Sequence, residues 1–267
     1  ENYCIVEQRG TLFDENEIAI NLPDNTGNPN GTNIQAKWAA LSNPYSASVK
    51  VSSLINTNTN KIQGNAVYVY IPDDNNGWQL YDPVIMGEKL ISRGCGFMIA
   101  TSEPTNGSKA GVTIKIEKND LYNGASTITN NNKSEDISVI KFNSQANNTT
   151  KTSYIVIKEK SNNGFDIDDA YSMFSNNENF VEPCFSIEGR NIIKNSISSL
   201  PYQTGINFHA DKASTVSFSC EDIPEDITVS IIDTTTNTET VLDNGGVFNF
   251  IANKGNNEGK YIIKLGK

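Results

Sequence analysis

Short runs of alternating apolar and polar residues recur along this chain, and turns rich in Asn, Gly and Pro separate them. The clearest run covers residues 66–71, and a return run at residues 78–81 follows it. Alternation with a period of two is typical of a strand with one buried face, and a polar turn between two such runs indicates a hairpin. The chain is therefore predicted to be all-β, built from antiparallel β-sandwiches (jelly-roll or Ig-like) rather than a parallel α/β sheet.

Two segments carry helical patterns instead. Val51, Leu54 and Ile55 have the spacing that places three apolar side chains on one face of a helix. Asp166 and Asp169 stand three residues apart, as in a capping box, and predict a second short helix over residues 166–174. The sequence thus predicts one short helix in each half of the chain.

A change of composition divides the chain of 267 residues. Residues 119–136 contain a run of three Asn, scattered Ser and Thr, and few apolar side chains, which is typical of a linker. The strand pattern starts again after it. We expect two tandem β-sandwich domains, residues 1–118 and 137–267, each large enough to bury its own core.

Charge excludes two classes of partner. The formal net charge is −10, and Lys and Arg form no basic patch along the sequence. Nucleic-acid binding depends largely on Lys and Arg that neutralise phosphates, and anionic membrane surfaces select the same side chains. No apolar run approaches the ~20 residues of a membrane-spanning helix. We therefore expect neither a nucleic-acid partner nor a transmembrane segment.

The four cysteines are Cys4, Cys95, Cys184 and Cys220, and the expected domain boundary leaves two on each side. In an exported protein this distribution allows the disulfides Cys4–Cys95 and Cys184–Cys220. The alternative is four free cysteines that act as small buried apolar residues. Since no Cys-x-x-Cys pair is present and the chain has one His, the sequence predicts no zinc site.

A motif in the first half resembles a family of bacterial exported proteins. Trp38-Ala-Ala-Leu-Ser-Asn-Pro-Tyr45 is similar to the "Trp-Asn-Leu-Ile-Gly-Asn-Pro-Tyr" motif of large exported proteins of Bacteroidetes, often found ahead of a type IX secretion sorting domain. In that family a short helix, a Tyr-Val-rich strand and "Gly-Gln-Gly-Phe-Phe-Val" follow. Residues 49–55, 67–70 and 94–99 stand in the same order here.

The second half resembles the same family. Residues 164–171, Gly-Phe-Asp-Ile-Asp-Asp-Ala-Tyr, are similar to its "Gly-Phe-Asp…Asp-Ala-Tyr", and residues 185–187 and 197–201 to its "Tyr-Ser-Leu" and "Ile-Asn-Ser-Leu-Pro". The resemblance implies extracellular β-sandwich modules of secreted or cell-surface proteins, and it implies no catalytic activity. We therefore expect an exported chain. Asp233-Thr234-Thr235 also fits the pattern that this bacterial group O-glycosylates, which makes Thr234 a candidate glycosylation site.

Aromatic residues are the candidate ligand contacts. Trp78, Tyr81 and Tyr70, with Tyr45, are candidates for a platform on which a sugar ring stacks. Trp78 flanks a polar turn and is predicted to be the most exposed of them. The alternative is that these rings pack in the core, as the alternation around Trp38 predicts for that residue.

A calcium site is a second hypothesis. Asp166, Asp168 and Asp169, beside two Asn residues, offer the oxygen ligands that calcium prefers, although the segment lacks the order of an EF-hand loop. Helix capping explains the same acids without a metal. The sequence predicts no catalytic residue and no cofactor, because His209 is the only histidine and no Gly-x-Ser-x-Gly motif or distinctive carboxylate pair accompanies it.

Together these features predict a non-enzymatic extracellular or cell-surface module for adhesion or ligand binding, with a glycan or a protein as its partner. Two alternatives stay open. One is a passive stalk that spaces another domain from the cell, and the other is an accessory region of a secreted hydrolase.

Overall fold

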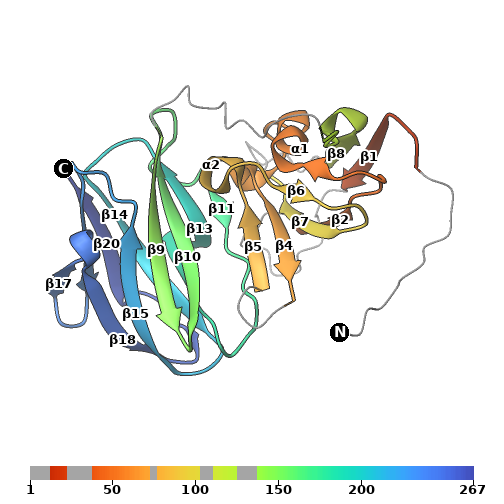
Figure 1. Cartoon of the computed structure of the whole chain (residues 1–267). Helices are drawn as coiled ribbons and strands as arrows, with labels where there is room; N and C mark the ends of the chain where they lie inside the picture. Colours follow the sequence, from red (N-terminus) through yellow and green to blue (C-terminus); the bar gives the residue numbers. More distant parts are fainter. Residues whose placement is uncertain (1–12, 23–37, 73–76, 103–110, 125–136) are drawn as a thin grey trace.

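The structure, a computed structural model of the chain, describes residues 13–22, 38–72, 77–102, 111–124 and 137–267. It is mostly β, as predicted (Figure 1). The first group of strands is β1 (Glu17–Leu22), β2 (Trp38–Ser42), β3 (Val49–Lys50), β4 (Val67–Ile71), β5 (Gly77–Tyr81), β6 (Leu90–Ile91), β7 (Gly96–Ala100) and β8 (Val112–Glu117). Two α-helices lie among them, α1 (Val51–Thr57) and α2 (Pro83–Met86).

The second group contains β9 (Ser138–Ala146), β10 (Thr149–Ile157), β11 (Ala170–Tyr171), β12 (Val181–Ile187), β13 (Arg190–Ile197), β14 (Tyr202–Ala210), β15 (Ser214–Glu221), β16 (Thr228–Asp233), β17 (Thr238–Val241), β18 (Val247–Ala252), β19 (Gly255–Asn256) and β20 (Tyr261–Gly266). All of these strands belong to one large sheet. Its main order is β17-β16-β20-β14-β12-β13-β10-β9-β15-β18, with β11 beside β13 and β19 beside β14. We call β1–β8 the N-terminal strands and β9–β20 the C-terminal strands.

The β9–β10 hairpin closes on one of the Asn-rich turns that separate the alternating runs. Asn147 and Asn148 connect the two strands with φ values of 49° and 63°. Positive φ at both central residues is the requirement of a type I′ turn, and asparagine tolerates this conformation better than most residues. Inside the large sheet the strands enclose an apolar core with Phe142, Phe185 and Phe208 among its members.

The prediction of purely antiparallel sheets is wrong at one place. β10 and β13 pair in parallel, from Tyr154 opposite Lys194 to Ile157 opposite Ile197. The chain between these strands runs through β11 and β12 before it returns, and this long crossover allows the parallel pairing.

The prediction of a second helix over residues 166–174 is also wrong. Both α-helices lie among the N-terminal strands, and no α-helix occurs in residues 137–267. Asp169 does accept a hydrogen bond from the Asp166 backbone N–H at 2.7 Å, as a capping pattern predicts. This contact closes a turn instead, because Ala170 and Tyr171 pair with β13. The capping signal was therefore correct for the contact and wrong for the element.

The N-terminal strands form a four-stranded sheet of order β2-β7-β4-β5 and the two-stranded sheets β1-β8 and β3-β6. Helix α1 buries Val51, Leu54 and Ile55, as its spacing predicts, in a core shared with one face of the four-stranded sheet. The prediction that Trp38 packs in the core of its sheet is wrong. Ala39 and Leu41 occupy the core face of β2, and Trp38 points to the other face with 37% of its surface exposed.

A smaller apolar cluster contains side chains of both strand groups. Ala66, Tyr68 and Leu80 of the N-terminal strands contact Ala170 of β11. Most of the predicted linker lies outside the described residues, but its first residues pack closely, since Asp120 is buried and accepts a hydrogen bond from Thr57 at 2.8 Å. Among the described residues, none of the helices has the length and apolar character needed to cross a membrane.

Candidate functional site

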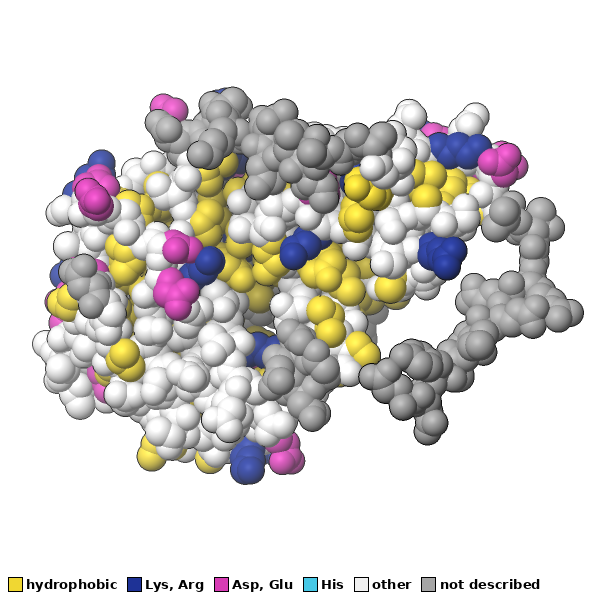
Figure 2. All heavy atoms as spheres, viewed as in Figure 1, with side chains coloured by type: hydrophobic (Ala, Val, Ile, Leu, Met, Phe, Trp, Pro, Cys, Tyr) yellow, Lys and Arg dark blue, Asp and Glu magenta, His cyan; other side chains and the backbone are white. Residues whose placement is uncertain are grey.

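Aromatic side chains gather on one face of the four-stranded sheet. Successive residues of a strand point to opposite faces. Val67, Leu41 and Ile99 point into the N-terminal core. The opposite face, which we call the aromatic face, presents Trp38, Tyr68, Tyr70, Trp78 and Met98. Figure 2 shows hydrophobic side chains in the middle of the molecule, where the two groups of strands meet.

Two edge-to-face ring pairs organise the aromatic face. Tyr70 of β4 stands opposite Trp78 of β5, with ring centroids 5.2 Å apart and planes at 66°. Trp38 of β2 lies 4.9 Å from Tyr68 at 72°. This geometry adds quadrupole attraction to the burial of apolar area. The rings therefore hold one another in fixed positions on the sheet.

The aromatic face is covered at one end and open at the other. Tyr68 is buried, and its hydroxyl donates a hydrogen bond to the Tyr171 carbonyl at 2.7 Å. Burial raises the pKa of the Tyr68 hydroxyl, so that it remains a donor. Tyr70 exposes 48% of its surface, and Trp78 is half-buried. The sequence predicts Trp78 as the most exposed ring, but Tyr70 is more exposed than Trp78.

The structure separates Tyr81 from Trp78 and Tyr70, and it buries Tyr45, the fourth candidate ring, in the N-terminal core. Trp78 and Tyr81 are three residues apart on β5, so their side chains leave opposite faces of the sheet. Tyr81 packs against the N-terminal core, and the Lys89 ammonium lies 5.9 Å from its ring centroid. Tyr70 and Trp78 therefore share one surface, and Tyr81 belongs to another.

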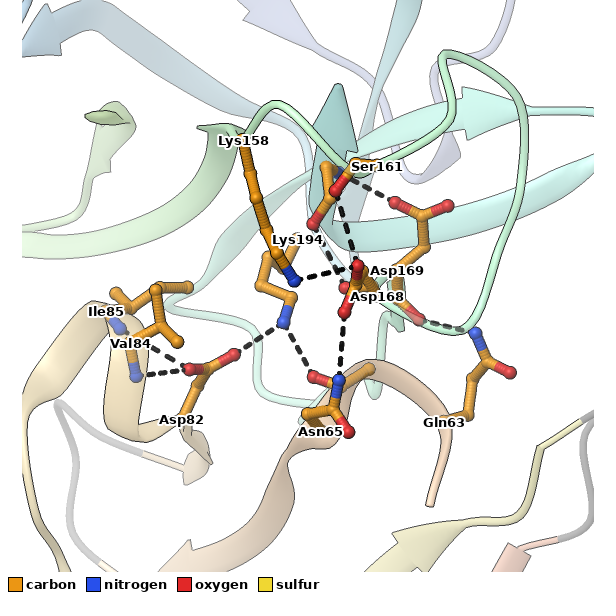
Figure 3. Close-up of polar contacts among 12 residues, drawn as sticks. Gln63, Asn65, Asp82, Val84, Ile85, Lys158, Ser161, Asp168, Asp169 and Lys194 are labelled. Carbon is orange, nitrogen blue, oxygen red and sulfur yellow. Dashed lines mark hydrogen bonds and ion pairs between the residues drawn. The ribbon is translucent and has the colours of Figure 1, made fainter. Parts of the chain in front are cut away.

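A buried polar network, which we call the polar joint, connects the two strand groups beside the aromatic face (Figure 3). The Lys194 ammonium donates to an Asp82 carboxylate oxygen at 2.6 Å and to the Gly64 carbonyl at 2.6 Å. The other Asp82 oxygen accepts from the backbone N–H of Val84 at 2.7 Å and of Ile85 at 3.4 Å. Asp82 is thus both the N-cap of α2 and the anion of an ion pair.

The loop before β11 supplies the rest of the polar joint. Asp168 accepts from Lys158 at 3.0 Å and from the Asn65 side chain at 3.0 Å. Asp169 is buried and accepts from the Ser196 backbone N–H at 2.7 Å. Burial raises the pKa of the Asp169 carboxyl to about 7, against the opposing effect of its backbone hydrogen bonds. Gln63 donates to the Asp169 carbonyl at 2.8 Å.

Two glycines allow the strand groups to approach this closely. Gly64 has a φ of +75°, and a Cβ there would lie 2.5 Å from the Ala170 Cβ. Gly77 has a φ of +62°, and a Cβ there would lie 2.5 Å from the Ser175 hydroxyl oxygen. That hydroxyl oxygen accepts a hydrogen bond from the backbone N–H of Trp78 at 3.1 Å. The aromatic face is therefore fixed against the C-terminal strands.

The three acids of the calcium hypothesis lie close in sequence but are occupied by protein donors. Asp166 accepts from the backbone N–H groups of Asn162 and Asp168, each at 2.8 Å, while Asp168 and Asp169 have the contacts given above. In the described ranges no group of three or more His, Cys, Asp and Glu side chains is placed to hold a metal ion. These contacts give the acids a structural role, and the calcium site stays a prediction.

For Cys184 and Cys220 the structure has the free-cysteine alternative and not the disulfide. Cys184 on β12 and Cys220 on β15 are free thiols. Cys220 lies in the core of the large sheet, whereas Cys184 is buried outside that core. Burial raises the pKa of the Cys184 thiol to about 12 and raises that of Cys220 as well. Cys95 is a free, exposed cysteine, and Cys4 lies outside the described residues, so their pairing stays untested.

The side chains of His209 and Thr234 both contact neighbouring protein groups. The His209 ring stacks on Phe174 with centroids 4.2 Å apart, and its Nδ1 lies 2.7 Å from the Asn256 side-chain oxygen. Thr234 is exposed in the turn after β16, where its hydroxyl donates to the Lys260 carbonyl at 2.9 Å. An attached glycan would therefore replace a hydrogen bond between this turn and the residue before β20.

Comparisons of the chain with protein-family models, with curated proteins and with solved structures found no match.

The sequence patterns do not predict the polar joint. Asp82 before Pro83 was a usable signal, since an N-cap acid followed by proline is typical of a helix start. Lys194 carried no such signal, because a lysine within a strand pattern is usually exposed.

Proposed function

We propose that this chain is a non-enzymatic module of an exported or cell-surface protein and that it binds a glycan through the aromatic face. The supporting observation is that Trp38, Tyr70 and Trp78 share one rigid sheet face, with Tyr70 48% and Trp38 37% exposed. Rigid aromatic rings offer a large apolar contact at a small cost in side-chain entropy. The C–H faces of a sugar ring fit such a surface.

The extracellular location is proposed from the resemblance of residues 38–45 and 164–171 to exported modules of Bacteroidetes. We also propose that residues 1–118 and 137–267 are two β-sandwich modules of a larger surface protein. Separate apolar clusters in the two strand groups support this division.

A glycan and matrix-protein array tests the binding function. We expect a glycan ligand whose affinity falls by at least about tenfold in Tyr70→Ala, because a stacked ring supplies roughly 1.4 kcal/mol or more. Val241→Ala is the matched control, since Val241 is an exposed apolar residue on β17, at one end of the large sheet and outside the sheet that has the aromatic face. Its affinity should equal that of the wild type. If Tyr70→Ala bound the glycan as tightly as the wild type does, the aromatic face would not be the binding site.

The polar joint favours a second candidate function, a rigid stalk. A buried ion pair and a buried apolar cluster between the strand groups would resist bending of the chain. A stalk would bind nothing on the array while keeping a single cooperative unfolding transition. Complete silence with a folded protein would therefore favour the stalk over the binding module.

A further inference from the structure

Strand β18 is an open edge of the large sheet. It ends the strand order and pairs with β15, from Ser219 opposite Val247 to Ser214 opposite Ala252 (Figure 1). Within residues 137–267 no further strand pairs with it. One row of its backbone N–H and C=O groups therefore faces outward. Such an edge is a template for pairing with another strand.

The side chains of β18 do not protect this edge. Residues 247–251 read Val-Phe-Asn-Phe-Ile, without charge, proline or glycine. Ile251 exposes 66% of its surface and Val247 47%, whereas Phe248 and Phe250 pack against the core. Proteins usually block an exposed edge with lysine, proline or a bulge. None of these devices is present in β18.

Residues 247–251 of β18 are symmetric about Asn249. A β-branched residue and a phenylalanine flank Asn249 on each side in mirrored order. If two such strands pair antiparallel with Asn249 opposite Asn249, Val247 lies opposite Ile251 in both directions. Each exposed apolar side chain then covers its counterpart. In an antiparallel ladder, two residues directly opposite each other either both point their backbone N–H and C=O groups toward the partner strand or both point them away. A register with Asn249 opposite Asn249 meets this requirement in either case.

We propose that β18 joins two copies of this chain through an antiparallel β18–β18 contact with a two-fold axis at Asn249. The occupant is a second copy because the symmetry of the strand is that of an isologous interface, where one patch contacts itself. β18 brings no charged side chain to the axis. The large sheet would continue from one copy into the next, and the closed two-fold contact would end the assembly at a dimer.

Size and charge predict a weak dimer. Interfaces that bury less than ~1,200 Å² are commonly transient. A contact through one strand of six residues on each copy buries less than this area. Each copy also carries a net charge of −10, so the two bodies repel each other outside the strand. Salt should therefore strengthen the dimer, because it screens this repulsion while the apolar contact persists.

Sedimentation velocity of the full chain tests the proposal, from about 1 µM to about 1 mM to cover the range of weak interfaces. We expect a monomer–dimer equilibrium that shifts toward dimer with added salt. Ile251→Lys should raise the dimer dissociation constant by at least about tenfold, since it places like charges beside an edge that must approach its copy. Val241→Lys is the control, since it adds the same charge at an exposed valine of β17, and it should dimerise as the wild type does.

A disulfide test keeps the proposal falsifiable if Ile251→Lys does not fold. In a Cys4→Ser, Cys95→Ser background, oxidised Asn249→Cys should form a covalent dimer, because residues directly opposite each other lie close to disulfide range. Thr236→Cys, in the exposed turn before β17, should not. A wild-type monomer at every concentration, growth beyond a dimer, or equal cross-linking by both cysteines would overturn the proposal.

Discussion

The Lys194 ammonium lies 2.6 Å from the Asp82 carboxylate, with 5% and 1% of the two side chains exposed, although 112 residues separate them in the chain. Replacing both members of such a deeply buried ion pair by apolar residues changes the stability little. Removing only one member leaves the other charge buried without a counter-ion or water, which is strongly destabilising. Asp82 and Lys194 therefore make the folding of β13 dependent on the strands before α2.

Lys194→Met should lower the free energy of unfolding by about 3–5 kcal/mol, because the Asp82 carboxylate would remain buried without its counter-ion. Urea denaturation followed by tryptophan fluorescence measures this loss. Lys115→Met is the control, since Lys115 pairs with Glu17 at 2.9 Å on the surface and should cost much less. A similar loss in both variants would contradict the importance of burial.

Gly64→Ala should destabilise the protein more than Gly94→Ala. Both glycines have positive φ, +75° and +68°, so alanine strains the backbone equally, by roughly 1 kcal/mol. A Cβ at Gly64 also meets the Ala170 Cβ at 2.5 Å, whereas nothing lies within 4 Å of a Cβ at Gly94. The difference in melting temperature between the two variants measures the close approach of the strand groups. Equal melting temperatures would show that the strand groups separate easily at this point.

Asp169 should make the protein less stable as pH rises. Burial raises the pKa of its carboxyl from 3.8 to about 7, so the fold favours the neutral form. The stability that this preference provides is fully present below the pKa of Asp169 in the unfolded chain. It is lost as pH rises through the folded pKa of about 7. Three pKa units correspond to on the order of 4 kcal/mol.

Urea denaturation of wild type and Asp169→Asn between pH 4 and pH 8 isolates this group from others that titrate. The wild type should lose more stability than Asp169→Asn as pH rises over this range, because the amide side chain of the variant has no proton to lose. Parallel pH profiles would show that backbone hydrogen bonds from Ser196 and Asp166 keep the carboxylate charged at little cost.

Cys184 and Cys220 should resist alkylation in the native protein. Both thiols are buried, and burial raises their pKa values, so little thiolate forms near neutral pH. In a Cys4→Ser variant, iodoacetamide should add one label to the native chain, at the exposed Cys95, and three labels to the denatured chain. Intact mass gives both counts. A denatured, unreduced chain with one label would instead reveal a Cys184–Cys220 disulfide.

Local sequence determined those parts of the fold that depend on neighbouring residues. The alternation over residues 112–117 fixes which side chains of β8 face the core, and Asn147-Asn148 fixes the β9–β10 turn through its tolerance of positive φ. The spacing of Val51, Leu54 and Ile55 fixes the buried face of α1. In each case the signal and the structure lie within a few residues of each other.

Tertiary contacts decided the rest. Residues 166–171 carry a helix-capping pattern, yet pairing of Ala170 with β13 made them a turn and a strand. The alternation of β2 allows Trp38 to face either side of the sheet. Ala39 and Leu41 occupy the core side, and Trp38 faces the C-terminal strands, where the Tyr171 ring lies 6.4 Å away. Lys194 and Asp82 belong to different strand groups, so only the packing of these groups brings the two side chains together. A local pattern contains the conformational preference of a segment, but the energy of burying a side chain depends on which distant surface covers it.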